Sequence, residues 1–179
     1  NIREAKTKIM TKRSLLFIIL LFSLSGNDTL WAQAASSPGE IIDLYNASFE
    51  DMPRASRAPR GWLNCGWADE SAPDTQPDST FKVFQMPSDG NSYLGMVTRD
   101  NDTWESVGQR LGSPLKGGKC YSFSIFLARS ESYISRSQAT GKTVNYNTPS
   151  QLRIWGGAGR CDRRELLAET KVINHFEWQ

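Results

Sequence analysis

One stretch near the middle of the chain constrains the fold more than any other. Residues 121–128 alternate along an extended backbone and place four apolar side chains on one side: Tyr121, Phe123, Ile125 and Leu127. This period of two is typical of a strand that buries one face in a core. Residues 112–118 before it contain a proline and three glycines, which exclude a helix. The stretch 109–128 therefore predicts a strand, a turn-rich loop and a long central strand.

The rest of the chain also favours short strands joined by turns. The sequence of 179 residues suits one domain of ordinary size. Further strands are predicted at 41–45, 93–98, 104–111, 151–155 and 165–171. Two long polar segments, 68–79 and 130–149, are predicted as loops. We therefore expect an all-β fold, an antiparallel β-sandwich over residues 41–179. The sequence stops inside a strand pattern at 176–179, which predicts a C-terminally truncated domain.

The N-terminal segment has the pattern of a secretory signal peptide. Lys12 and Arg13 precede an apolar run at 15–22, and Ala32-Gln33-Ala34 fits an A-x-A cleavage site. The apolar run is too short to span a bilayer. We expect residues 1–34 to be removed, with Met10 as the start, and 35–40 to be a short linker. This predicts a secreted, periplasmic or cell-surface protein with no stable membrane span after cleavage.

The charge distribution argues against a nucleic-acid partner. The formal net charge is +2, but the first 34 residues alone contain five basic and two acidic groups. The remaining chain is nearly neutral and offers no basic surface for a phosphate backbone.

Export would place the three cysteines in an oxidising compartment, where disulfides persist. Because Cys65, Cys120 and Cys161 are odd in number, at most two can pair with each other. Cys120–Cys161 is the favoured pair, since both residues flank predicted core strands. Cys65–Cys120 is the alternative.

Four motifs carry a resemblance to a known family. They are Asn-x-Ser-Phe-Glu at 46–50, Arg-Gly-Trp at 60–62, Gly-x-x-Tyr-Leu-Gly at 90–95, and the stretch 109–124 that ends in Gly-x-x-Tyr-Ser-Phe-Ser. In this order and spacing they resemble the carbohydrate-binding-module-like, galactose-binding-like jelly-roll domains of secreted and outer-membrane-associated bacterial proteins. The resemblance covers residues 41–179. It implies a jelly-roll sandwich and a carbohydrate ligand.

The same resemblance implies a role for Glu50. In similar jelly rolls the glutamate of the Phe-Glu motif helps bind a structural calcium ion together with backbone carbonyls and a late aspartate. Calcium requires six to eight oxygen ligands. Glu50 is therefore expected either to bind a structural calcium ion or only to cap a loop.

Aromatic and polar residues mark a candidate ligand site. Sugars stack their apolar C–H faces on exposed aromatic rings, while polar side chains bond their hydroxyls. Trp104 follows an acidic loop formed by Asp100, Asn101 and Asp102, which makes it the best-placed platform. Trp155 is the second candidate.

Arginines mark a second segment. Arg54, Arg57 and Arg60 lie among prolines and alanines in a loop that either faces an anion or sugar or is merely solvated.

Catalytic patterns are weak. The single histidine, His175, lies on a predicted strand, and no Gly-x-Ser-x-Gly elbow is present. The leading hypothesis is a secreted, non-catalytic module that binds carbohydrate at the cell envelope. The alternative is a structural or protein-interaction module whose partner is an envelope protein. A secreted hydrolase is the least favoured.

Overall fold

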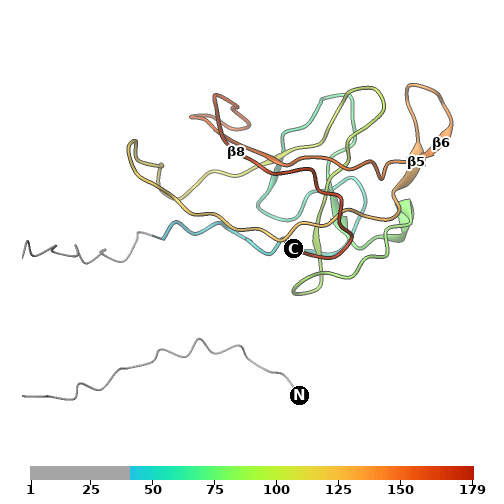
Figure 1. The fold of residues 1–179 in the computed structure, drawn as a ribbon, viewed down its shortest axis with the longest axis horizontal. Helices are drawn as coiled ribbons and strands as arrows, with labels where there is room; N and C mark the ends of the chain where they lie inside the picture. Colours follow the sequence, from blue (N-terminus) through green and yellow to red (C-terminus); the bar gives the residue numbers. More distant parts are fainter. Residues whose placement is uncertain (1–40) are drawn as a thin grey trace, which may run out of the picture. The chain divides into compact units, whose positions relative to one another are not determined.

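The computed structural model describes residues 41–179. The predicted signal peptide and linker lie outside the described residues. The described chain forms a body in which short strands alternate with long extended connections (Figure 1). No helix in this part of the chain is long and apolar enough to cross a membrane.

Eight short strands pair into four two-stranded antiparallel sheets within residues 41–179. β1 pairs with β4, β2 with β3, β5 with β6, and β7 with β8. A single 3-10 turn, η1 (Ser79–Phe81), is the only helical element in the described chain. The all-β prediction is therefore confirmed. The strands are β1 Leu63–Asn64, β2 Asp74–Gln76, β3 Tyr93–Gly95, β4 Val107–Gly108, β5 Ile134–Arg136, β6 Thr143–Asn145, β7 Arg153–Gly156 and β8 Glu165–Glu169.

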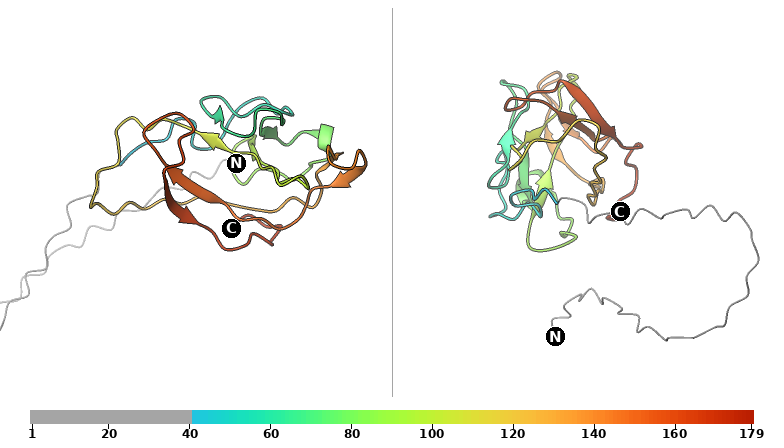
Figure 2. Two further views of the ribbon diagram at one scale, coloured as in Figure 1. Left: turned by 90° about the horizontal axis from the view of Figure 1, so that it is seen from above. Right: turned by 90° about the vertical axis from the view of Figure 1, so that its left-hand side faces the viewer.

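The longest ladder joins β7 to β8, close to where strands were predicted. Its register shifts between Ile154 and Trp155, a β-bulge that bends the pair. In the view from above, this hairpin lies on one side of the body, opposite the segment that contains β2 and β3 (Figure 2). The predicted loop 130–149 also contains a hairpin, β5–β6, which the sequence pattern did not indicate.

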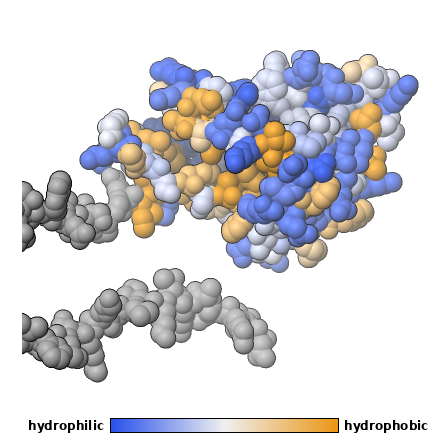
Figure 3. Space-filling model, in the orientation of Figure 1, coloured by the Kyte–Doolittle hydropathy of each residue, from blue (hydrophilic) through white to orange (hydrophobic). Residues whose placement is uncertain are grey.

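The predicted central strand is wrong. Residues 121–128 run as an extended segment outside any sheet. On the face predicted to be buried, Tyr121 and Phe123 are 43% and 55% exposed, and Ile125 and Leu127 are half-buried. The backbone of the segment pairs only near the end, where Leu127 exchanges two hydrogen bonds with Gln179 (2.8 and 3.1 Å). Alternation predicts a buried face only when another layer covers it, and the described chain covers this face only in part, at Ile125 and Leu127. Hydrophobic side chains accordingly reach the surface on the face that this segment crosses (Figure 3).

The first predicted strand, 41–45, is also wrong. Its backbone forms hydrogen bonds with a side chain and not with another strand. The Gln109 amide accepts from the Tyr45 N–H and donates to the Tyr45 carbonyl, both at 2.8 Å. A glutamine side chain carries a carbonyl that accepts and an NH2 group that donates. It can therefore satisfy both backbone groups of Tyr45, as a neighbouring strand would.

The buried core of the described chain is small and partly polar. Val83, Val97 and Tyr133 form its apolar centre. β2 lies beside it with Asp74, Thr75 and Gln76 all at most 1% exposed. The predicted loop 68–79 thus contains one of the most buried segments, because its polar side chains find partners inside the protein.

The disulfide joins Cys65 to Cys161 across 96 residues, with a Cα–Cα distance of 5.2 Å. Neither predicted pairing is correct: Cys120 is a free, exposed thiol. The reason is that the segment around Cys120 is not in a core strand. Cys65 follows β1, next to Gly108 of β4, and Cys161 lies in the turn between β7 and β8.

Candidate functional site

The four motif segments quoted from the sequence meet in space. Trp62 donates from Nε1 to the carbonyl of Asn46 (3.0 Å), and its ring packs on Phe49 with centroids 4.9 Å apart. The Asn46 amide donates to the carbonyls of Glu50 and Arg60. Gln109 reaches the same region through its contacts with residues 45 and 61. These bonds fix the loop 46–62 against the rest of the domain.

Glu50 lies at the edge of this network. Its carboxylate accepts the backbone N–H of Asn91 at 3.0 and 3.2 Å. Gly90 has φ +67°, and a Cβ there would lie 1.8 Å from Glu50 Oε1, so the carboxylate and the turn fit closely. Within residues 41–179 no group of three or more His, Cys, Asp or Glu side chains could hold a metal ion. The loop-capping contact is present, and the calcium role stays a prediction.

The acidic loop before Trp104 is held by hydrogen bonds. Asp100 accepts from the hydroxyls of Ser137 (2.7 Å) and Tyr146 (3.0 Å). These bonds, led by that from Ser137, lower the pKa of Asp100 below its ordinary value and keep it ionised. The structure therefore uses this carboxylate to anchor β5 and β6, and its oxygens face protein donors.

Asn101 and Asp102, the next two residues of this loop, differ in their hydrogen bonds. The Asn101 amide donates to Oε1 of Glu70 (2.7 Å) and its carbonyl accepts from the Thr103 hydroxyl (2.8 Å). Asp102 is exposed and has φ +60° at the loop tip. No hydrogen bond to its carboxylate is present in the described residues, which leaves both oxygens open to solvent.

Trp104 forms an exposed pair with a second tryptophan. The Trp67 and Trp104 rings meet edge to face, with centroids 5.4 Å apart at 86°. They are 47% and 44% exposed, and the edge of one ring packs against the face of the other. Glu70 connects the segments that carry the two tryptophans. Its N–H donates to the Trp67 carbonyl (3.2 Å), and its carboxylate accepts from the hydroxyl of Thr103, the residue before Trp104 (3.0 Å).

Trp155 lies on β7 and is 39% exposed. No ring contact joins it to another aromatic residue among residues 41–179. The structure thus brings together Trp104 and the 100–102 loop, and it adds Trp67, but it does not add Trp155 to this group.

A buried charged network lies behind the loop. The Arg99 side chain, 8% exposed, bonds to the carboxylates of Glu70 (3.3 Å) and Glu105 and to the Ser71 hydroxyl (2.7 Å). Burial raises the pKa of Glu105 to about 7, although Arg99 opposes the shift. Burial likewise raises the pKa of Asp74, which accepts a bond from the Tyr133 hydroxyl (2.9 Å). The sequence offered no signal for this network, since its acids lie in segments predicted as loop and strand surface.

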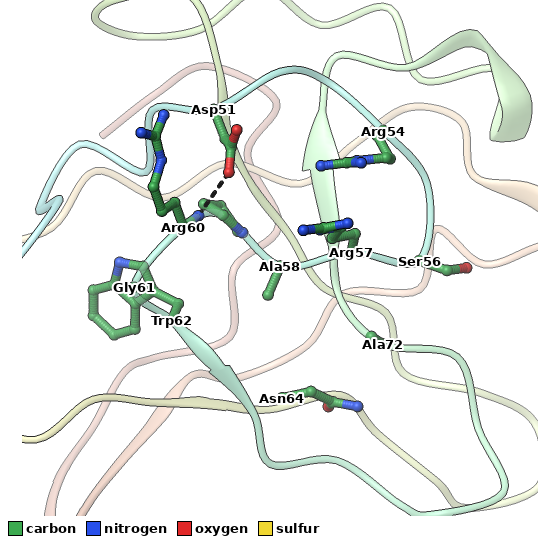
Figure 4. Close-up of a pocket in the computed structure, with 11 residues that line it drawn as sticks. Asp51, Arg54, Ser56, Arg57, Ala58, Arg60, Gly61, Trp62, Asn64 and Ala72 are labelled. Atoms are coloured by element: carbon green, nitrogen blue, oxygen red, sulfur yellow. Dashed lines mark hydrogen bonds between the residues drawn. The ribbon is translucent and has the colours of Figure 1, made fainter.

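The arginine loop borders a cavity of about 520 Å³ (Figure 4). Arg54, Arg57 and Arg60 all line it, together with Asp51 and one edge of Trp62. The Asp51 carboxylate accepts the N–H groups of Met52 (2.8 Å) and Arg60 (2.9 Å). The hollow is open to solvent, so the ligand-facing and the solvated interpretation of this loop both stay predictions.

His175 does not belong to a catalytic arrangement in the described chain. Its Nδ1 lies 2.7 Å from the carbonyl oxygen of Glu177, and the ring has no serine or carboxylate contact in residues 41–179.

Comparison with known proteins gave no match, whether with protein-family models, curated sequences or solved structures.

Proposed function

We propose that this chain is a non-catalytic binding module whose ligand is a carbohydrate. The observation that carries the proposal is the exposed Trp67–Trp104 pair, fixed at right angles by ring packing. Two perpendicular rings present one flat face and one edge, which together form a corner. A pyranose ring that stacks on one face meets the other ring at its rim, and stacking of this kind is the usual way proteins hold sugars.

Polar groups next to the tryptophans supply hydrogen bonds for hydroxyls. The open carboxylate of Asp102 lies two residues before Trp104 and accepts from sugar hydroxyls in this proposal. Asn101 and Glu70 bond each other and hold the loop, so they are positioning residues. Pre-formed loops lose little entropy on binding, which favours a fixed site over a mobile one.

The finer fold and the location belong to the same proposal. A galactose-binding-like jelly roll is supported by the meeting of Asn46, Trp62, Asn91 and Gln109 in one network. Secretion to the periplasm or cell surface is supported by the N-terminal pattern and by a disulfide between Cys65 and Cys161.

A glycan array tests the proposal. The chain from residue 35 onward, with its disulfide formed, is compared with its Trp104→Ala variant. We expect the wild type to bind defined glycans and the Trp104→Ala variant to lose that binding. Binding of no glycan, or equal binding of neutral glycans by both proteins, would reject the tryptophan pair as a carbohydrate site.

A second candidate function rests on a separate observation. Tyr121, Phe123 and Phe126 expose aromatic area along an unpaired extended segment, and such patches are common at protein–protein interfaces. This favours an envelope-protein partner if no glycan binds. Phe123→Ser with Phe126→Ser should then abolish capture of that partner while leaving the fold unchanged.

A further inference from the structure

Three arginines around the cavity of Figure 4 lack partners for their guanidinium groups. In the described chain no hydrogen bond or ion pair reaches the side chains of Arg54, Arg57 or Arg60. Nε of Arg54 is buried without any hydrogen-bond partner. A buried donor left unpaired costs free energy. Among the residues that line the cavity, Asp51 is the one acid that can offset the guanidinium charges.

The loop that carries these arginines is fixed by the buried strand β2. Arg54 exchanges two backbone hydrogen bonds with Thr75 (2.7 and 3.0 Å), and the Thr75 hydroxyl donates to the Arg57 carbonyl (2.8 Å). The N–H of Ser56 donates to Asp74 at 2.6 Å. The backbone positions of the arginines are therefore set by the core, as a pre-organised site requires.

The charge in the cavity is positive even after its one acid is counted. Figure 4 shows the Arg54 and Arg57 side chains on one side of Asp51 and that of Arg60 on the other. Hydrogen bonds from backbone N–H groups, led by that of Met52, lower the pKa of Asp51 below its ordinary value. Asp51 thus stays ionised and offsets one of three guanidinium charges.

We propose that this cavity binds an acidic saccharide through its oxyanion group, which is a carboxylate or a sulfate. Planar guanidinium groups pair with oxyanions through two parallel bonds, which favours this chemistry over neutral hydroxyls. The cavity of about 520 Å³ is larger than a bare inorganic ion needs and lies in the usual range for small organic ligands. Trp62 supplies an apolar wall for the sugar ring, and Asn64 and Ser56 supply neutral polar groups.

This site is separate from the tryptophan pair, and only the saccharide class of its ligand rests on the proposed function. Trp67 and Trp104 do not line the cavity, and no arginine of the cavity contacts either ring.

Nuclear magnetic resonance titration with matched sugars tests the proposal. D-Galacturonic acid, D-galactose 6-sulfate and neutral D-galactose are added separately to the ¹⁵N-labelled chain at one ionic strength. We expect at least one acidic sugar to shift the signals of residues 54–62 in a saturable way, and galactose to leave them unchanged. If only one of the two acidic sugars binds, its charged group identifies the oxyanion. If both bind, the site recognises what carboxylate and sulfate have in common as oxyanions.

Variants test whether the arginines are responsible. Arg57→Gln alters an exposed side chain without structural contacts, and it should weaken binding of the acidic sugar at least tenfold while the spectrum stays folded. Lys142→Gln removes the same charge at the β5–β6 hairpin and should leave the affinity unchanged. Equal shifts with neutral galactose, no saturable shift with either acid, or unchanged affinity in Arg57→Gln would overturn the proposal.

Discussion

The hydroxyl of Tyr133 donates a 2.9 Å hydrogen bond to Oδ2 of Asp74, a carboxylate with no exposed surface. The same carboxylate accepts from the Gln76 amide (3.1 Å) and the Ser56 N–H (2.6 Å). A single buried acid therefore connects β2, the arginine loop and the segment that leads into β5.

Removing that hydroxyl should destabilise the fold. Tyr133→Phe leaves Asp74 with one fewer donor in a buried setting, which costs about 1–3 kcal/mol. Urea denaturation measures the loss. Tyr121→Phe is the matched control, because its hydroxyl accepts a bond at an exposed site. Equal stability of the two variants would contradict the role given to Tyr133.

Stability should depend on pH through Glu105. Burial raises its pKa in the folded state from an ordinary 4.5 to about 7, so folding takes up a proton between these values. The free energy of unfolding should therefore fall as the pH rises from about 4.5 to 7, by up to about 3 kcal/mol, and level off above.

Urea denaturation at pH 5, 6, 7 and 8 measures this slope. Glu105→Gln has no such titration and should show a flatter profile, with the slope that remains arising from Asp74, whose pKa burial also raises. A wild-type profile that rises over this range, or identical slopes in both proteins, would rule out Glu105 as the titrating group.

The disulfide should contribute strongly to stability. Cys65→Ser with Cys161→Ser opens a loop of 96 residues, for which the chain-entropy model gives about 4–5 kcal/mol. Cys120→Ser should have no effect, because that thiol is free. Peptide mapping without reduction should recover a Cys65–Cys161 cross-link, and a cross-linked peptide containing Cys120 would contradict the structure.

A side chain at position 90 should also be costly. Gly90→Ala places a Cβ 1.8 Å from Glu50 Oε1 in a backbone with φ +67°, so the carboxylate must leave the Asn91 N–H. We expect a loss of about 1–3 kcal/mol in thermal or urea denaturation. Gly117→Ala, which meets no atom within 4 Å, is the control. A neutral Gly90→Ala would show that the Glu50 contact contributes little.

The sequence predicted the all-β class of the fold better than it predicted the arrangement of the strands. The strands predicted at 151–155 and 165–171 overlap β7 and β8, although their pairing was not predicted. Periodicity around Phe123 predicted a strand that does not form, because alternation describes a backbone and cannot say what covers its apolar side.

Two other parts of the structure were beyond any local pattern. Asp74 lies in a polar segment that resembles a loop, and only distant donors such as Tyr133 permit its burial. Cys65 and Cys161 pair because β1 lies next to the β7–β8 turn, a tertiary relationship across 96 residues.

The candidate site was predicted in part. Trp104 and its loop were identified from adjacent aromatic and acidic residues. Trp67 was missed as its partner, although a second exposed tryptophan 37 residues earlier was visible in the sequence. Spacing alone could not bring these rings together, since the contact depends on how β1 and β4 pair.

Isothermal titration of the glycan that the array identifies tests the central claim most directly. The wild type is compared with Trp104→Ala, Trp67→Ala and Trp155→Ala, the last of which removes a similarly exposed tryptophan from β7. Loss of a stacking ring should weaken binding about tenfold or more in the first two variants and leave Trp155→Ala at wild-type affinity. Wild-type affinity in Trp104→Ala and Trp67→Ala would contradict the tryptophan pair as the carbohydrate site.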